Sequence, residues 1–297
     1  GRGRGRRRLR PTPRLFKRVV TPLGAALLGL VAAGGTPALA QAPDEAWRTL
    51  TTEHFRVTFP EGLEQLGRAA ADRAERAWLQ LEEDFIEPPG GPIDILVTDH
   101  ADVSNGFAQV RPSNRITIFA RPPVDEPSIG HNDEWLELVI THELAHIVHL
   151  DHVTNPIGRA ARAVFGRGES DWPFFPETAT PRWLIEGLAT WYESRLSDAG
   201  RLRGTYLEMQ LRTAMLEGRF ESIGQAGGSS PLWPAGNRPY AYGSLFFDFL
   251  LERHGAESLT AFVDAIGGQW IPYRLDAAAH DAFGVSLSDE WRAWRDS

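Results

Sequence analysis

The sequence of 297 residues contains no cysteine, so disulfides cannot stabilise its fold and no cysteine is available to carry a lipid anchor. Methionine is scarce, since Met209 and Met215 are the only two. After residue 40 the chain lacks internal repeats and low-complexity linkers. At this length, with 42% hydrophobic residues, it can bury a substantial core. These features favour one large domain or two subdomains over a chain of small modules.

Acidic side chains are absent from residues 1–18, which carry nine basic ones. An apolar run follows from Val19 to Gly35, and Ala38-Leu39-Ala40 supplies small residues at its end. A basic, then apolar, then small-residue order is typical of a secretory signal peptide, and the apolar run is short for a membrane-spanning helix. We therefore predict a signal peptide at residues 1–40 and an exported protein, periplasmic or secreted. A nucleic-acid-binding arm and a retained membrane anchor are the alternatives for this segment.

Basic side chains are in the minority after residue 40. Nine of the 31 in the chain lie before that point, so residues 41–297 hold 22 basic and 39 acidic side chains, a formal net charge of −17. A domain this acidic has no general affinity for nucleic acid or for anionic membranes. We expect neither as a partner once the signal peptide has been removed, and no stable membrane insertion.

Hydrophobic periodicity divides residues 41–297 into two parts. In residues 41–131, short apolar alternations predict strands at 47–59, 93–97, 106–110 and 115–120, with a long amphipathic helix at 61–85. In residues 132–297 the pattern is mostly helical. The expected fold class is α+β, with a small N-terminal mixed sheet and its helix packed on a mainly helical C-terminal subdomain. Helices are predicted there at 134–149, 181–193, 202–217, 241–254, 256–266 and 286–295.

The helix at 134–149 contains the H-E-x-x-H pattern, formed by His142, Glu143 and His146. Residues four apart differ by about 40° around a helix, so both imidazoles project from one face. Two neutral imidazoles in this arrangement can bind one Zn²⁺, and a Glu beside the first ligand can reach a metal-activated water. This helix is apolar on nearly all sides, which predicts a buried position between sheet and helices.

A catalytic zinc site needs a third protein ligand and an open position. His152 is one candidate, because it continues the histidine series of the motif. On a continuing helix it would lie roughly 80° from the direction of His142, too far round to share a metal. His149, one turn after His146, is expected to support the site or pack in the core. The other candidate is Glu186, on the next predicted long helix.

The segment Trp183-Leu184-Ile185-Glu186-Gly187-Leu188-Ala189 resembles the W-L-x-E-G-x-A segment of gluzincins, the thermolysin- and aminopeptidase N-like zinc peptidases of clan MA. The resemblance implies a thermolysin-like zincin fold with Zn²⁺ as the cofactor, bound by His142, His146 and Glu186. It also implies that Glu193 orients a ligand His. The spacing of 40 residues between His146 and Glu186 is longer than usual, and a loop rich in proline and aromatic residues accounts for the extra length.

From Trp47 to Trp294 the chain also resembles the bacterial peptidase MA-like domain often found ahead of a β-propeller. The matching segments include Asn105–Ala108 and Phe283–Leu287. This resemblance implies a possible C-terminal propeller in a longer protein.

The gluzincin resemblance implies peptide-bond hydrolysis, with Glu143 as general base and a downstream Tyr as donor to the developing oxyanion. Tyr242 is the first choice and Tyr240 the second, and a core aromatic is the alternative for either. Aminopeptidase N-like enzymes anchor the free amine of the substrate with a Glu in a region that corresponds to residues 105–120 here, which contain no acid. We therefore predict an endopeptidase. An aminopeptidase is the alternative, and so is a catalytically silent, zinc-stabilised binding module of the cell envelope, which would not require Glu143.

Two further segments could contact a peptide or protein substrate. Trp172, Phe174 and Phe175 in the long loop either plug the core or wall a substrate subsite. The strand at 115–120 either forms the sheet edge that pairs with an extended substrate or only completes the sheet.

Overall fold

The computed structural model describes residues 45–124, 129, 134–229 and 231–297, and the chain from Glu45 to Ser297 forms one compact unit. The predicted signal peptide at residues 1–40 lies outside the described residues. No helix in the part of the chain that the structure describes is long and apolar enough to cross a membrane.

Five strands form one mixed sheet in the order β1-β2-β3-β5-β4. The β2–β3 and β3–β5 pairs are parallel, and the two outer pairs are antiparallel. The predicted strand at 47–59 is a hairpin rather than one strand, because the chain turns where Thr52 donates its backbone N–H to the Phe55 carbonyl. The strands are β1 (Trp47–Thr51), β2 (Phe55–Pro60), β3 (Ile93–Thr98), β4 (Gly106–Gln109) and β5 (Arg115–Phe119).

The edge of the sheet is formed by β4, not by β5. β5 is paired on both sides, with β3 and with β4. Of the two interpretations of residues 115–120, the substrate-pairing edge is therefore wrong, since the strand completes the sheet and β4 forms the edge.

One face of the sheet is covered by two helices, α2 (Glu64–Asp84) and α3 (Trp135–Leu150). α2 packs on β1 and β2, α3 packs on β4 and β5, and the two helices contact each other. Strand side chains alternate between faces. Val57, Ile95 and Ile116 are buried beneath the helices, whereas the other face carries the Arg56–Asp94 ion pair.

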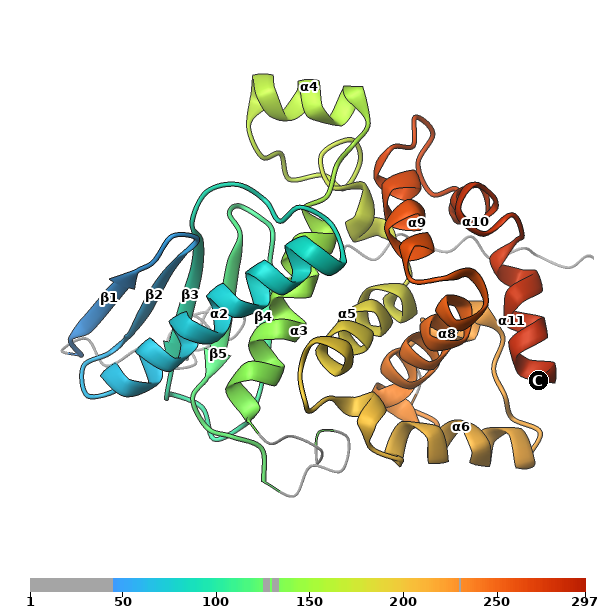
Figure 1. Ribbon diagram of the computed structural model, residues 1–297, viewed down its shortest axis with the longest axis horizontal. Helices are drawn as coiled ribbons and strands as arrows, with labels where there is room; N and C mark the ends of the chain where they lie inside the picture. Colours follow the sequence, from blue (N-terminus) through green and yellow to red (C-terminus); the bar gives the residue numbers. More distant parts are fainter. Residues whose placement is uncertain (1–44, 125–128, 130–133, 230) are drawn as a thin grey trace, which may run out of the picture. The chain divides into compact units, whose positions relative to one another are not determined.

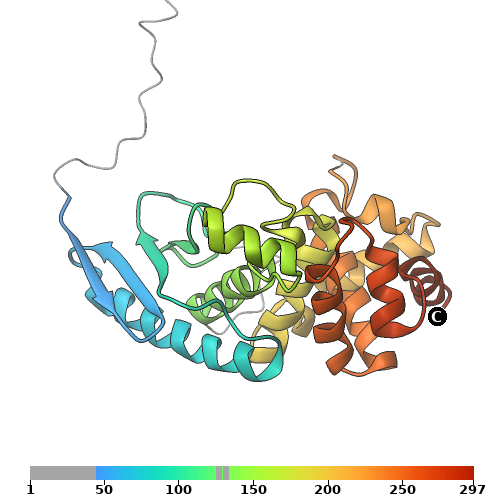
Figure 2. The same cartoon turned by 90° about the horizontal axis from the view of Figure 1, so that it is seen from above.

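The helical part is built around α5 (Arg182–Leu196) and α8 (Arg238–His254). α3 packs on α5, and α5 packs on α8, so the elements follow the order sheet, α3, α5, α8 in both views (Figures 1 and 2). Gly187 and Gly243 permit the close approach of α5 and α8. A Cβ on Gly243 would lie 1.9 Å from the Trp183 carbonyl oxygen, so a larger residue there would force the two helices apart.

The remaining helices surround this pair. The prediction of an α+β fold with a small mixed sheet and a mainly helical remainder is confirmed. Among the described α-helices, the sequence patterns missed α4, α7 and α10. The remaining elements are α4 (Pro156–Phe165), η1 (Pro176–Ala179), η2 (Arg201–Arg203), α6 (Tyr206–Leu216), α7 (Ile223–Ala226), η3 (Ala235–Asn237), α9 (Glu257–Gly267), α10 (Leu275–Phe283) and α11 (Leu287–Asp296).

Candidate metal centre

The two motif histidines lie one turn apart on α3, and both are buried. Their Nε2 atoms are 3.1 Å apart. The helix forms here because the run is rich in Leu, Ile and Val, whose side chains are buried against the sheet on one side and α5 on the other. The imidazoles therefore point into the space between α3 and α5.

Glu186 on α5 completes a group of three. Its Oε2 atom lies 3.7 Å from His142 Nε2 and 3.4 Å from His146 Nε2. Ligand atoms bonded to a tetrahedral Zn²⁺ at roughly 2.0–2.2 Å lie about 3.4 Å apart, so the three separations fit zinc. Within the described ranges, these three side chains are the one cluster of His, Asp or Glu found with metal-binding spacing. His152 lies outside it and bonds instead to Asp264, with Nε2 and Oδ1 2.7 Å apart.

Glu193 holds the first histidine from the other side of the ring. His142 Nδ1 donates to Glu193 Oε2 at 2.8 Å, which leaves Nε2 directed at the cluster. Burial lowers the pKa of His142, but hydrogen bonds with the carboxylates of Glu186 and Glu193 outweigh it and raise the pKa to about 9. Without a metal, the imidazole is therefore protonated at neutral pH and lies between two carboxylates.

Glu143 faces the same space, in a pocket of about 340 Å³. Burial raises the pKa of its carboxyl, with the neighbouring histidines acting in the opposite direction. Gly106 of β4 lies against it, because a Cβ there would be only 3.0 Å from Glu143 Oε1. The backbone of the edge strand thus runs directly beside this carboxyl. The lining residues are Asn105, Gly106, Phe107, Ala108, Glu143, His146, Leu150, Ile185, Glu186 and Tyr240.

The structure corrects the choice of Tyr242. That side chain is only 1% exposed, its ring stacks on Trp291, and its hydroxyl accepts a hydrogen bond from the Glu221 backbone N–H at 3.0 Å. Tyr240 lines the pocket instead, with its ring centroid 6.3 Å from that of His142. Side chains two residues apart on a helix point in directions about 200° apart around its axis. Only one of the two tyrosines can therefore face the group of His142, His146 and Glu186.

The loop aromatics do not line this pocket. Phe175 is fully buried, and the Arg162 guanidinium lies 4.4 Å from its ring centroid. The substrate-subsite interpretation of Trp172, Phe174 and Phe175 is not supported by these positions, and Phe175 plugs the core.

Two residues near the site were missed by sequence reasoning. Glu177, fully buried, pairs with His149, and Arg201 pairs with Glu193. No local pattern marks either residue. Arg201 and Arg203 look equivalent in the sequence, and only the path of the chain distinguishes them.

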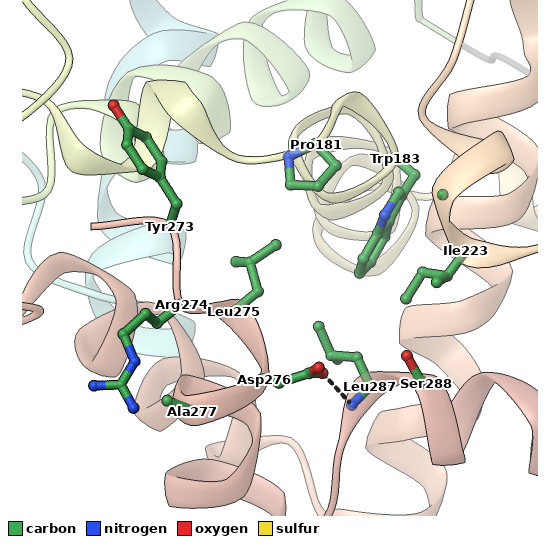
Figure 3. A pocket seen from close by; sticks show the side chains of 11 residues that line it. Pro181, Trp183, Ile223, Tyr273, Arg274, Leu275, Asp276, Ala277, Leu287 and Ser288 are labelled. Carbon is green, nitrogen blue, oxygen red and sulfur yellow. Dashed lines mark hydrogen bonds between the residues drawn. The ribbon is translucent and has the colours of Figure 1, made fainter. Parts of the chain in front are cut away.

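A second pocket, of about 470 Å³, lies between the start of α5 and the segment that contains α10 and α11 (Figure 3). Trp183, Leu275 and Leu287 are among the apolar side chains around it. The carboxylate of Asp276 already accepts from the Leu287 backbone N–H at 3.2 Å. His142, His146 and Glu186 are not among the residues that line this pocket.

No protein-family model matches the sequence, and no curated protein matches it. Among solved structures, an M1 zinc metallopeptidase from Deinococcus radiodurans is 15% identical with a TM-score of 0.45, over 84% of this chain and 51% of that one. Yeast LTA4 hydrolase is 16% identical with a TM-score of 0.40, over 74% and 33%. An aminopeptidase N family protein from Idiomarina loihiensis is 14% identical with a TM-score of 0.37, over 84% and 44%.

The chain spans about half the length of these proteins or less. Similarity at this level transfers no function.

Proposed function

We propose that His142, His146 and Glu186 bind Zn²⁺ and that the protein hydrolyses peptide bonds as a thermolysin-like gluzincin. One observation carries this proposal: three ligand atoms lie 3.1–3.7 Å apart, and two of the residues that carry them, His146 and Glu186, line a pocket together with Glu143 and Tyr240. When bound, Zn²⁺ supplies a Lewis acid that polarises the scissile carbonyl and acidifies a water molecule.

Glu143 is the group we propose as general base. Its carboxylate takes the proton of the attacking water and passes it to the leaving amine. A base works best when its pKa lies near the working pH, and burial shifts the pKa of Glu143 upward in that direction. A zinc site that only stabilised a fold would have no need for a buried carboxyl in this position.

Tyr240 is the group we propose as oxyanion donor. Burial and the neighbouring Glu186 carboxylate raise the pKa of its phenol, so the hydroxyl keeps its proton and remains a donor. A donor aimed at the developing charge is worth about 100- to 1,000-fold in rate in other enzymes.

The proposed substrate is an extended peptide that pairs with β4. Among the described strands, β4 is paired only with β5, so its outer edge beside Glu143 is open to a substrate strand. The Gly106 N–H at this edge donates to Asn105 Oδ1 at 2.9 Å, a bond that a pairing substrate would replace. Of the described residues that line the pocket, Glu143 and Glu186 are the acids, and both already have roles. No lining carboxylate remains to bind a free amine, which favours cleavage inside chains over aminopeptidase action.

The test is made on the full chain with its metal content measured by mass spectrometry. We expect about one zinc per chain, hydrolysis of casein, no hydrolysis of amino-acid anilides, and loss of hydrolysis in Glu143→Ala with zinc retained. Anilide cleavage alone would make the protein an aminopeptidase. Bound zinc without hydrolysis of either substrate would favour a catalytically silent binding module. Export to the periplasm or the medium, and a C-terminal propeller in a longer protein, are further proposals that rest on the sequence patterns.

A further inference from the structure

The guanidinium of Arg201 lies among groups of the metal centre, although the proposed reaction does not use it. Arg201 opens η2, the short 3-10 helix that follows α5. Its side chain is only 11% exposed. A charged group buried this far needs partners, and its partners define what it does.

The first partner is Glu193, whose side chain is fully buried. The Arg201 backbone N–H donates to Glu193 Oε1 at 3.0 Å, and the guanidinium Nε lies 3.3 Å from the same oxygen, an ion-pair contact without hydrogen-bond geometry. The guanidinium Nη1 donates to Thr190 Oγ1 at 3.4 Å, on the same helix as Glu193. The other carboxylate oxygen accepts from His142. Once His142 binds a metal it is a neutral imidazole, so Arg201 is then the cation that compensates the buried carboxylate.

The second partner is Tyr240. The guanidinium carbon lies 4.7 Å from the centroid of the phenol ring, within the range of a cation–π contact. The same ring also stacks near the His142 imidazole, with ring centroids 6.3 Å apart and an interplanar angle of 26°. The direction of the Tyr240 hydroxyl therefore depends on where the guanidinium lies.

The chain reaches this position through a turn that does not itself need the guanidinium. Gly200 has φ of +105°, and a Cβ there would lie 2.4 Å from Ser194 Oγ. The backbone of Leu202 donates to the same Oγ at 3.1 Å, and Arg203 donates to the Ser194 carbonyl at 3.0 Å. These contacts fasten η2 to the last turns of α5, so truncating Arg201 leaves the turn in place.

We propose that Arg201 is a positioning residue shared by two parts of the site. It holds Glu193 against His142, which directs Nε2 at the metal, and it holds the ring of Tyr240 over the pocket. The second role rests on the proposed function. The first needs only that His142, His146 and Glu186 bind zinc.

The first role is tested by zinc affinity, measured on the metal-free full chain by competition with a chromophoric chelator. Loss of a group that orients a ligand costs about 10- to 100-fold in metal affinity. We expect Arg201→Ala to weaken zinc binding roughly tenfold and Arg201→Lys to recover part of that loss. Because Arg201 acts through Glu193, adding Arg201→Ala to Glu193→Gln should cause no further loss.

Arg203→Ala is the matched control, since it removes the other arginine of the same short helix, whose Nε donates to the Ser194 carbonyl, while the Leu202 N–H still holds η2 to Ser194 Oγ. It should bind zinc within about twofold of the wild type. Wild-type affinity in Arg201→Ala would overturn the first role. So would losses that multiply in the double variant, or an equal loss in Arg203→Ala.

The second role is tested by kinetics at saturating zinc. We expect Arg201→Ala to lower kcat about tenfold or more with KM little changed, and to lower it no further in a Tyr240→Phe background. An unchanged kcat, or an equal loss in both backgrounds, would overturn this role. If the wild type hydrolyses nothing, the proposed function fails, and the zinc comparison alone decides whether Arg201 positions the site.

Discussion

Two buried histidines two turns apart on α3, His142 and His149, each pair with a buried glutamate, and the two pairs differ in whether their members are ionised. His142 donates to Glu193 at 2.8 Å, and His149 Nε2 lies 3.0 Å from Glu177 Oε2. The two hydrogen bonds are similar in length, and all four side chains are buried. The pKa values nevertheless shift in opposite directions, up for His142 and down for His149.

The neighbours of each pair explain the difference. Burial disfavours the charged form of the side chains in both pairs. At the second pair it lowers the pKa of His149 to about 3 and raises that of Glu177 well above its usual value, so the His149–Glu177 pair is neutral. At the first pair, Glu186 adds a second carboxylate beside His142. The pKa of Glu193 remains low because Arg201 and His142 outweigh its burial. The His142–Glu193 pair is thus ionised because Glu186 and Arg201 add favourable charges beside it, whereas at the other pair the Asp264 carboxylate acts with burial to raise the pKa of Glu177.

The largest expected effect comes from removing the carboxylate that distinguishes the two pairs. Glu186→Ala deletes both a proposed ligand and one of the groups that keep His142 charged. Its zinc affinity should fall by more than the roughly 100-fold that loss of an orienting partner can cost. Chelator competition measures this, with Glu208→Ala, a change in an exposed helical ion pair, as the control. Retained zinc affinity in Glu186→Ala would remove α5 from the metal centre.

Matched substitutions in the two pairs come next. Glu193→Gln should weaken zinc binding about 10- to 100-fold, because a neutral amide holds His142 less firmly and in a less basic state. Glu177→Gln, the same change at the neutral pair, should leave zinc affinity within about twofold. An equal loss of zinc affinity in both variants would contradict the difference between the two pairs, since both would then support zinc binding.

The sequence predicted the parts of this site that depend on one helix or on a motif. The helical spacing brought His142 and His146 to one face, and the segment around Glu186 indicated the second helix. It could not separate Tyr240 from Tyr242, because the choice depends on how α8 is rotated against α5, and the contact of Gly187 with Gly243 sets that rotation.

Contacts that depend on the path of loops could not be predicted from the sequence. Glu177 reaches His149 from η1, and Arg201 reaches Glu193 only because Gly200 turns the chain back onto α5. The edge position of β4 was missed for a similar reason. Strand order in a mixed sheet depends on pairing between segments far apart in the sequence. The alternation of apolar and polar residues within one strand does not predict which strand lies next to it.

The pH dependence of zinc uptake gives a smaller and more graded effect. In the metal-free protein, the pKa of His142 is about 9, so a metal must displace its proton at any lower pH. Protonation of His142 should therefore lower zinc affinity about tenfold for each pH unit below 9, and this contribution levels off above that pH. His149 adds no proton in this range, because its pKa is about 3.

Calorimetry at pH 8 in two buffers of different ionisation enthalpy counts the protons directly. We expect about one proton released for each zinc bound. A count of zero would mean that His142 is already neutral, and the two pairs would then be alike.

The smallest expected effect tests the neutral pair by itself. With the pKa of Glu177 raised and that of His149 lowered, the Glu177 carboxyl carries the proton and donates it to the imidazole Nε2. Glutamine has the same shape and can donate from its amide, so Glu177→Gln should change the free energy of unfolding by less than about 1 kcal/mol. Glu177→Ala leaves His149 without this partner and opens a cavity, and should cost about 2–3 kcal/mol or more. Urea denaturation of the metal-free protein measures both variants. If Glu177 were an ionised partner, its replacement by glutamine would destabilise the fold about as much as replacement by alanine, because a buried imidazolium would be left uncompensated.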